Sequence, residues 1–293
     1  MNCVVLSLAM AMAVAPVAAP PSALRVGMID TEGSATAEQD AALVANYFGK
    51  VMGRPVTAKV YKEYGQLAAD FTTERVDLAW LPPALTVPAI VAGATLIAKV
   101  VRGNSASYLS VVFARADSPI TDLHKVKKAS IAWVDRSSAA GFVFPGAAMV
   151  KDKVPVRQAL GKQSFLGNHR AVCEAVLKGD AQLGATFANP AGPGKPLEPT
   201  GCVLAFGPEV SAKLKILLSS GAIPSDALAT RPGTAPVLVK QLTEVALGMA
   251  TTPDGRDVLA KVFHADRLAT ASEADYEPVA AALEAAGRIP KSK

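Results

Sequence analysis

Several residue types that commonly mark a function are scarce in this chain of 293 residues. Aromatic residues make up only 5% of it, and no run of Lys or Arg is interleaved with them, so a nucleic-acid-binding surface is not expected. The net charge is +5 and the basic residues are scattered, which fits a small anionic ligand and equally fits no ligand. The three histidines and three cysteines show no metal-ligand spacing, so the sequence predicts neither a metal site nor a cofactor.

Motifs that carry catalysis are missing as well. The sequence contains no G-x-S-x-G, no Walker loop, no G-x-G-x-x-G and no H-E-x-x-H. Ser138 and His169 could be imagined as a nucleophile and its base, but no acid that would orient the imidazole is evident. We therefore expect a protein that is not an enzyme.

The first 23 residues carry no charged side chain, and the apolar run from Val4 to about Val14 is too short to span a bilayer. Residues 1–23 are therefore interpreted as a signal peptide, with an uncleaved anchor as the alternative. No later segment has a long enough apolar run to cross a membrane, so we expect an extracytoplasmic protein. Of the cysteines outside this leader, Cys173 and Cys202 form either one disulfide or two buried thiols.

Hydrophobic residues make up 51% of the chain and charged residues 19%, which is typical of a folded globular protein. Short β-rich segments alternate with amphipathic segments of helical spacing, first over residues 24–115 and again over residues 128–187. This order of elements predicts an α/β protein with mostly parallel sheets and helices on their faces. The length and the two cycles favour two similar lobes.

The stretch IAWVDRSSAAGFVFP, from Ile131 to Pro145, runs from a predicted strand ending at Val134 into a helix predicted to start near Gly141. Small residues in such a turn leave backbone N–H groups uncovered. At a helix start these groups lack intrahelical partners and the helix dipole is positive, so an anion can bind there. The alternative is an ordinary N-cap at Ser138 without any ligand.

Several segments, taken in order, resemble one known family. They are LRVGMID, GRPVTAKVYKEYGQLAADFTTERVDLAWLPP, SYLSVVFARADSPITDL, IAWVDRSSAAGFVFPGAAM, SFLGNHRAVCEAVLKGDAQLGATF, GAIPSDALATR and EADYEPV. The family is that of the periplasmic phosphate-, phosphite- and phosphonate-binding proteins of ABC importers. The resemblance extends over most of the chain after the leader.

The resemblance implies the type II periplasmic-binding-protein fold, in which two Rossmann-like lobes are joined by two crossing hinge strands. It places the crossings at Tyr108 to Ala114 and at about Ala227 to Arg231. Lobe 1 is then expected over residues 24–112 plus 228–293, and lobe 2 over residues 113–227. Ligand would lie in the cleft between the lobes, at the carboxyl ends of parallel strands.

The same resemblance implies a set of ligand-binding residues, namely Tyr64, Tyr108, Ser137, Ser138, Ala139, Ala140, Gly141, His169 and Thr186. Three of them have a structural alternative of their own: core packing for Tyr108, a surface position for Tyr64 and an N-cap role for His169. The family pattern has hydroxyl residues where this chain has Ala139 and Ala140, so up to two donors are missing. Gln182 stands where the family often has an acid, which argues against a ligand with an amino group.

From these residues we expect a solute-binding protein of an ABC importer that captures phosphonate, phosphite or phosphate between its lobes. The alternative is a sensor or orphan receptor on the same fold with a different small ligand. The partners implied are a small anionic ligand and an ABC permease in the membrane. The resemblance further implies a monomer, located in the periplasm or outside the cell.

Overall fold

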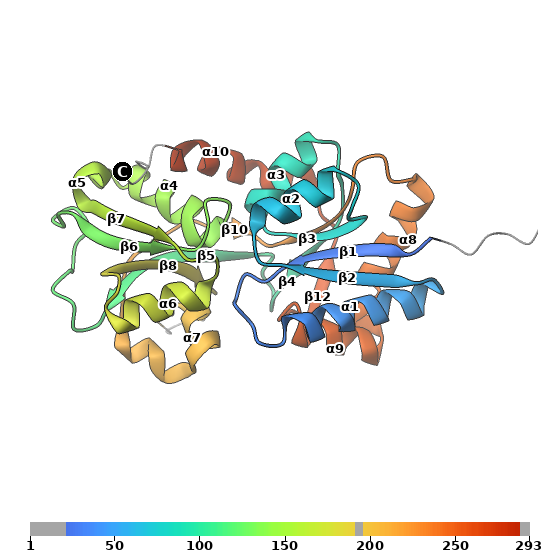
Figure 1. Ribbon diagram of the computed structural model, residues 1–293, viewed down its shortest axis with the longest axis horizontal. Coiled ribbons are helices and arrows are strands. Elements are labelled where there is room, and N and C mark those ends of the chain that lie inside the picture. Colours follow the sequence, from blue (N-terminus) through green and yellow to red (C-terminus); the bar gives the residue numbers. More distant parts are fainter. Residues whose placement is uncertain (1–21, 191–195, 288–293) are drawn as a thin grey trace, which may run out of the picture.

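The computed structural model describes residues 22–190 and 196–287. Two separate sheets, each covered by helices, lie side by side along the long axis of the molecule (Figure 1). The predicted α/β class and two-lobed architecture are confirmed. The predicted leader, residues 1–23, lies almost entirely outside the described residues. Within the described ranges, no helix is both long enough and apolar enough to span a membrane.

The sheet of the first lobe has six strands in the order β12-β4-β11-β3-β1-β2. Their bounds are β1 Leu24–Ile29, β2 Val56–Tyr61, β3 Leu78–Leu81, β4 Thr95–Val101, β11 Ala227–Thr230 and β12 Arg267–Ala269. β1 runs parallel to β2 and β3, whereas β11 and β12 are antiparallel to β4. The central strands β1 and β3 are almost wholly buried because helices cover both faces of the sheet.

The helices of the first lobe are α1 Ala37–Met52, α2 Tyr64–Thr72, α3 Pro83–Val91, α8 Pro236–Leu247, η3 Met249–Thr251 and α9 Pro253–Lys261. α1 connects β1 to the parallel strand β2, and α2 connects β2 to β3, which is also parallel to β1. Each connection therefore crosses over the sheet through a helix. Residues such as Phe48, Leu242 and Leu259 pack against β1 and β3 in one buried cluster. In Figure 1, α1 and α9 lie on one side of this sheet and α2 and α3 on the other.

The sheet of the second lobe has the order β10-β5-β8-β6-β7, with β9 paired to β5 as well. Its strands are β5 Ser107–Arg115, β6 Ala129–Trp133, β7 Leu160–Phe165, β8 Leu183–Ala188, β9 Leu214–Ser219 and β10 Ile223–Pro224. Its helices are η1 Ala139–Val143, α4 Phe144–Lys151, α5 Val156–Ala159, α6 His169–Lys178, α7 Thr200–Phe206 and η2 Pro208–Lys213. α4 and α5 cover one face, and α6 and α7 the other (Figure 1).

Each sheet is mixed, whereas the alternation of strands and helices predicts mostly parallel sheets. The difference arises from strands next to the hinge: β11 pairs antiparallel with β3 and β4, and β5 pairs antiparallel with β8. The chain passes from the first sheet to the second between β4 and β5, and returns between β10 and β11. β5 pairs only within the second sheet along its described length. The lobe boundaries at residues 112 and 227 stay a prediction.

The C-terminal segment, η4 Glu273–Tyr276 and α10 Glu277–Ala286, lies over both lobes rather than over the first alone (Figure 1). α10 packs against α3 of the first lobe and against η1 and α4 of the second. Val279 and Ala282 join the same buried cluster as the core of the second lobe. The phenol of Tyr276 donates to the carbonyl oxygen of Ser225, which lies in the return crossing. The segment η4–α10 therefore contacts both lobes and the return crossing between them.

Candidate functional site

A cavity of about 150 Å³ lies between the two lobes. Its walls come from segments that follow strands β1, β3, β4, β6 and β8, from the starts of α2, β5 and α6, and from α7 and the return crossing. The lining residues are Thr31, Glu32, Tyr64, Trp80, Pro82, Arg102, Tyr108, Ser138, Ala139, Ala140, His169, Phe187, Asn189, Thr200, Leu204, Asp226 and His264. This is where α/β sheets characteristically bind ligands, at the carboxyl ends of their parallel strands.

The turn after β6 forms the floor of the cavity on the second lobe. The helix begins at Ala139, two residues before the predicted start near Gly141, as a π-helical turn that continues into α4. The carbonyl oxygen of Ser138 accepts the amides of Phe142 and Val143, and its Oγ accepts the amide of Gly141 at 3.1 Å. π-helical turns inside helices occur frequently at functional sites.

Two backbone amides of this turn remain without an acceptor. Ala139 and Ala140 are buried, line the cavity, and donate to no group in the described part of the chain. The carbonyl oxygen of Ala140 accepts from Ser110 Oγ at 2.7 Å, so β5 fixes the orientation of this turn. The positive end of the helix and two free N–H groups thus meet at the cavity between the lobes, which favours a bound anion.

Two predicted donors of this turn have other roles. The amide of Ser137 donates to Asp135 Oδ1 at 2.7 Å, and Ser137 does not line the cavity. Gly141 does not line it either: its amide is bonded to Ser138, and a Cβ on this residue would lie 2.4 Å from Val134. Glycine is required there for close packing on β6, not for the approach of a ligand.

Both predicted tyrosines line the cavity. Tyr64, the first residue of α2, is fully buried, and burial raises its pKa well above the ordinary value even though the Ser138 hydroxyl beside it acts in the opposite direction. Burial likewise raises the pKa of Tyr108, whose ring meets Phe187 edge-on at 6.5 Å. Both phenols are therefore neutral at physiological pH and can donate hydrogen bonds.

His169 is the first residue of α6 and lines the cavity while only 5% exposed. The N-cap of α6 is its neighbour Asn168, whose side chain accepts from Ala171, so His169 itself is free of that role. Burial lowers the pKa of His169 to about 4, so the imidazole is neutral at pH 7. Thr186 does not line the cavity; its Oγ1 lies 2.9 Å from Nδ1 of His169.

The opposite wall, from the first lobe and the hinge, carries charged residues that the sequence interpretation missed. A guanidinium nitrogen of Arg102 lies 4.0 Å from Oδ2 of Asp226, and Nε2 of His264 lies 3.6 Å from Oε2 of Glu32. Burial raises the pKa of Asp226 above its ordinary value. The charge of Arg102 and a hydrogen bond from Trp80 act in the opposite direction but do not outweigh burial. Burial alone would raise the pKa of Glu32 too, but the hydrogen bond and charge of His264 lower it below the ordinary value. Glu32 therefore already has His264 as a partner within the protein, and Asp226 has Arg102.

These residues come from separate loops, so no local pattern joins them in the sequence. Only their positions next to predicted strands could have pointed to the site. Glu32 follows β1 and Asp226 precedes β11, both at the hinge side of the first sheet. Trp80 both lines the cavity and packs on Phe263 at 4.5 Å between ring centroids. Trp80 is therefore both a wall of the cavity and part of the packing of the first lobe.

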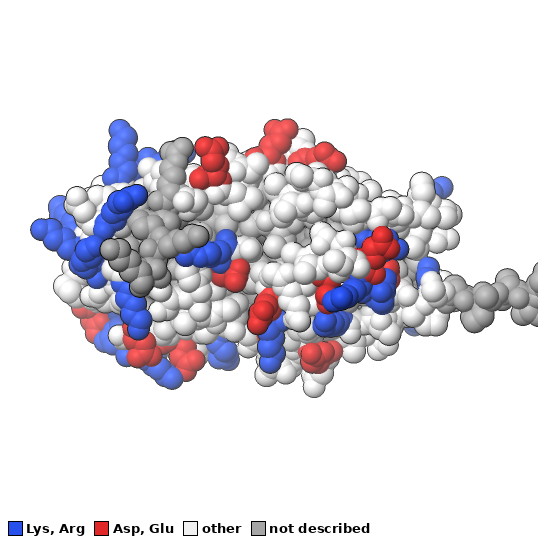
Figure 2. All heavy atoms as spheres, turned by 45° about the horizontal axis from the view of Figure 1, so that its top comes forward, with Lys and Arg blue, Asp and Glu red and all other residues white. Residues whose placement is uncertain are grey.

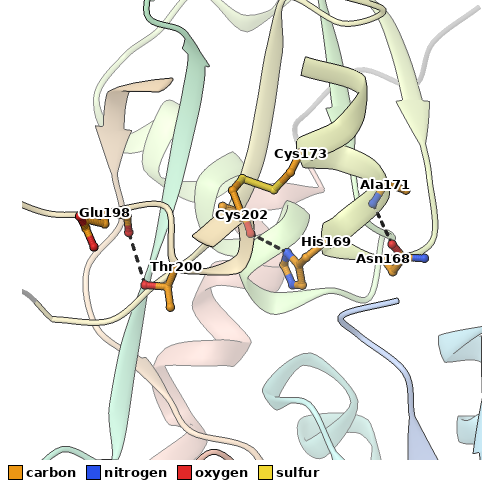
Figure 3. The surroundings of a disulfide bond; sticks show 8 residues. Asn168, His169, Ala171, Cys173, Glu198, Thr200 and Cys202 are labelled. Carbon is orange, nitrogen blue, oxygen red and sulfur yellow. Dashed lines mark hydrogen bonds between the residues drawn. A yellow bond between two sulfur atoms is a disulfide. The ribbon is translucent and has the colours of Figure 1, made fainter. Parts of the chain in front are cut away.

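Cys173 and Cys202 form a disulfide, the first of the two alternatives that the sequence leaves open. The bridge joins α6 to α7, which lie side by side in Figure 3. α6 carries His169 at its start, and α7 carries Thr200 and Leu204 of the cavity wall. The disulfide therefore ties together two helices that both contribute to the site.

Comparison with known proteins identifies the family and the fold. Residues 26–276 match the family model described as ABC transporter, phosphonate, periplasmic substrate-binding protein. The fold is similar to that of a binding protein component of an ABC phosphonate transporter from Pseudomonas aeruginosa, with TM-score 0.78, 19% identity, and coverage of 91% of this chain and 87% of that one.

Two further solved structures share the fold. PhnD1 from Prochlorococcus marinus, in complex with methylphosphonate, has TM-score 0.76 and 18% identity over 91% of this chain and 99% of that one. The periplasmic aliphatic sulphonate-binding protein SsuA from Escherichia coli is more distant, with TM-score 0.58 and 12% identity over 90% of this chain and 86% of that one.

Proposed function

Since the chain belongs to the periplasmic substrate-binding proteins of ABC phosphonate transporters, we propose that its inter-lobe cavity captures a phosphorus oxyanion: phosphonate, phosphite or phosphate. The closed protein would then deliver this anion to a membrane permease. A signal peptide over residues 1–23 would direct the chain out of the cytoplasm.

The observation that carries this proposal is the pair of buried, unpaired amides at Ala139 and Ala140. An unsatisfied buried N–H costs free energy, on the order of 1–3 kcal/mol, which an anionic oxygen in the cavity would recover. The hydroxyl groups of Tyr64 and Ser138 and the ring of His169 border the same space. Several neutral donors around one small space suit a tetrahedral oxyanion better than a cation.

The remainder of the ligand would be small and without an ammonium group. The volume of about 150 Å³ leaves little room beyond one oxyanion, and Trp80, Phe187 and Leu204 provide apolar wall. The two acidic side chains of the cavity, Glu32 and Asp226, are already paired within the protein, with His264 and Arg102 respectively, so neither is left for an ammonium group of the ligand. Within this class, a short alkylphosphonate such as methylphosphonate therefore fits best.

We infer binding without turnover. The Ser138 Oγ that could have served as a nucleophile caps its own helix by accepting the amide of Gly141, and Nδ1 of His169 faces a threonine, not a carboxylate. A monomer is expected in solution, because the cavity needs no second chain to be complete. Nucleic acid is not an expected partner, because the sequence has no run of Lys or Arg interleaved with aromatic residues; on the face in Figure 2, Lys and Arg are most frequent toward the left end, with Asp and Glu at its lower edge.

One feature favours a second candidate function, a sensor or orphan receptor for a different small ligand. Ala139 and Ala140 supply backbone N–H donors but no side-chain hydroxyl groups. A bound oxyanion would therefore receive fewer hydrogen bonds than if these two residues were serine or threonine. A weaker oxyanion site could serve signalling by a ligand with a different shape.

Isothermal titration calorimetry with methylphosphonate, phosphite, phosphate and sulfate tests the proposal. We expect saturable binding of at least one phosphorus oxyanion, tighter than that of sulfate. If methylphosphonate, phosphite and phosphate all fail to bind, and another small molecule stabilises the protein in a thermal-shift screen, the receptor function is favoured instead. Phosphorus-31 NMR after prolonged incubation should show only the starting compound, because no turnover is expected.

A further inference from the structure

We propose that Thr186 is a positioning residue for ligand binding: its hydroxyl donates to Nδ1 of His169, keeps the ring proton on Nε2, and so aims an N–H donor into the cavity. The proposal rests on the proposed function, because the acceptor of this donor is the oxyanion. It assigns a defined role to a residue that contacts no ligand itself.

The two ring nitrogens of His169 have different surroundings. Nδ1 lies 2.9 Å from Oγ1 of Thr186, a residue of β8 that is fully buried. Nε2 has no hydrogen-bond partner among the described residues, and the ring lines the cavity. The ring is also held edge-on against Phe187, with 5.0 Å between centroids and an interplanar angle of 83°. Its orientation is therefore set by neighbours on two sides.

At neutral pH the imidazole carries a single proton, because burial lowers the pKa of His169 to about 4. A neutral ring has one N–H and one bare nitrogen, and the partner of one nitrogen decides the state of the other. Which nitrogen holds the proton therefore determines whether the ring offers the ligand a donor or a lone pair.

Hydrogen-bond accounting at Thr186 selects between the two tautomers. If Nδ1 held the proton, it would donate to Oγ1 of Thr186. The hydroxyl proton of Thr186 would then have no acceptor, because His169 is the only partner of Oγ1 in the described part of the chain. A buried donor without an acceptor is costly. If the hydroxyl donates to Nδ1 instead, both groups are satisfied and Nε2–H is left for an oxyanion. The second arrangement also avoids placing a lone pair against a negative charge.

Helix α7 closes the space around the Thr186 hydroxyl. A Cβ at Gly201 would lie 2.2 Å from Thr186 Oγ1, so the α7 backbone lies directly against the hydroxyl. The next residue, Cys202, is bonded to Cys173, which lies four residues after His169 on the same face of α6 (Figure 3). His169, Thr186 and the two helices thus form one closed structural unit, and the hydroxyl has little freedom to turn elsewhere.

Nitrogen-15 NMR of protein labelled at histidine reads the tautomer directly, because protonated and bare ring nitrogens have well-separated shifts. The ligand-free protein is measured at pH 7, and His169→Gln identifies the signals among the three histidines. We expect Nε2–H in the wild type and in Thr186→Ser, and loss of this single tautomer in the isosteric Thr186→Val. Finding the proton on Nδ1 in the wild type would overturn the proposal even if no variant folded.

Calorimetry with methylphosphonate gives the second readout. Thr186→Val should weaken binding by about tenfold, the loss expected when one hydrogen bond is no longer prearranged, and Thr186→Ser should restore it. Thr230→Val is the matched control, since Thr230 is equally buried on a strand of the first lobe and outside the cavity. Wild-type affinity in Thr186→Val would refute the role. Failure of the wild type to bind any phosphorus oxyanion would refute the proposed function while leaving the tautomer measurement valid.

Discussion

The backbone amide of His169 donates to the carbonyl oxygen of Thr31 at 2.9 Å, which joins the start of α6 in the second lobe to the loop after β1 in the first. Beside this bond, Gly33 packs against the side chain of Asn168, the N-cap of α6. Both contacts join the first lobe to the second. The structure is therefore a closed form, and the residue proposed to bind the oxyanion also takes part in closing the lobes.

Gly33→Ala should weaken ligand binding by hindering this closure. Gly33 has φ +71°, and an added Cβ would lie 2.7 Å from Oδ1 of Asn168, the atom that caps α6. Open lobes avoid this clash, whereas the closed form does not. We expect calorimetry with methylphosphonate to show an affinity at least tenfold lower than in the wild type.

The matched control is Gly53→Ala. Gly53 has a similar φ of +62°, but an added Cβ there would meet nothing within 4 Å. Both substitutions should cost about 1 kcal/mol of stability, because the left-handed backbone conformation disfavours any residue with a Cβ. Equal losses of affinity in the two variants would show that strain within the first lobe, and not lobe closure, is responsible.

Ser138→Ala should lower both affinity and stability. Its Oγ caps the helix by accepting the Gly141 amide, a role worth about 1 kcal/mol of the free energy of unfolding, and the hydroxyl faces the cavity beside Tyr64. We expect binding of methylphosphonate to weaken by more than tenfold, because the same change loosens the turn that presents the amides of Ala139 and Ala140.

Ser137→Ala separates this effect from a general disturbance of the turn. Ser137 lies outside the cavity, and only its backbone amide is engaged, with Asp135. Calorimetry should give an affinity within about twofold of the wild type, since a change in free energy below about 0.5 kcal/mol is typical of a surface substitution. A large loss in this variant would place the oxyanion on the opposite side of the turn.

The architecture could be predicted from the sequence because it rests on repeated local signals. Alternating β-rich and helical segments predict two α/β cycles, and the strand up to Val134 followed by small residues predicts a turn with free amides. Tyr64, Ser138 and His169 lie at element starts, where position along the chain nearly fixes position in the fold. These three residues meet in one cavity.

The remaining parts of the site depend on distances that no local pattern contains. Arg102 and Asp226 meet because the two hinge crossings lie side by side, 124 positions apart in the chain. Thr186 is predicted to bind ligand but lies outside the cavity, whereas the next residue, Phe187, lines it, because neighbouring side chains on β8 point to opposite faces. The pairing of Cys173 with Cys202 depends on how α7 packs against α6, and a separation of 29 residues is compatible with either outcome.

Removal of the disulfide should destabilise the protein measurably. Closing a loop of 29 residues is worth about 3–4 kcal/mol in the chain-entropy account. The double variant Cys173→Ala/Cys202→Ala should lose stability of this order in urea unfolding, and added reductant should affect the wild type but not the variant. A wild type whose unfolding curve is the same with and without reductant would indicate that the two thiols are not bridged.

The stability of the protein should fall between pH 6.5 and about 4 because of His169. Its pKa is about 4 in the folded protein and near 6.5 in the unfolded chain, so the unfolded chain binds more protons within this window. Stability from this group is therefore complete above pH 6.5 and is lost on acidification, with a slope of at most about 1.4 kcal/mol per pH unit. Urea unfolding at several pH values measures it.

His169→Gln should remove this part of the pH dependence, and His124→Gln should not. His124 lies on the surface, where hydrogen bonds to Asp152 and Asp122 raise its pKa, so its stabilising contribution is present at low pH and is lost as the pH rises. The difference between wild type and His169→Gln reports the titration of this imidazole together with that of Glu32, whose pKa the charge of His169 helps to lower. A difference that stays constant from pH 7 to pH 4 would mean that His169 is as free to take up a proton in the folded protein as in the unfolded chain, which contradicts its burial in a closed cavity.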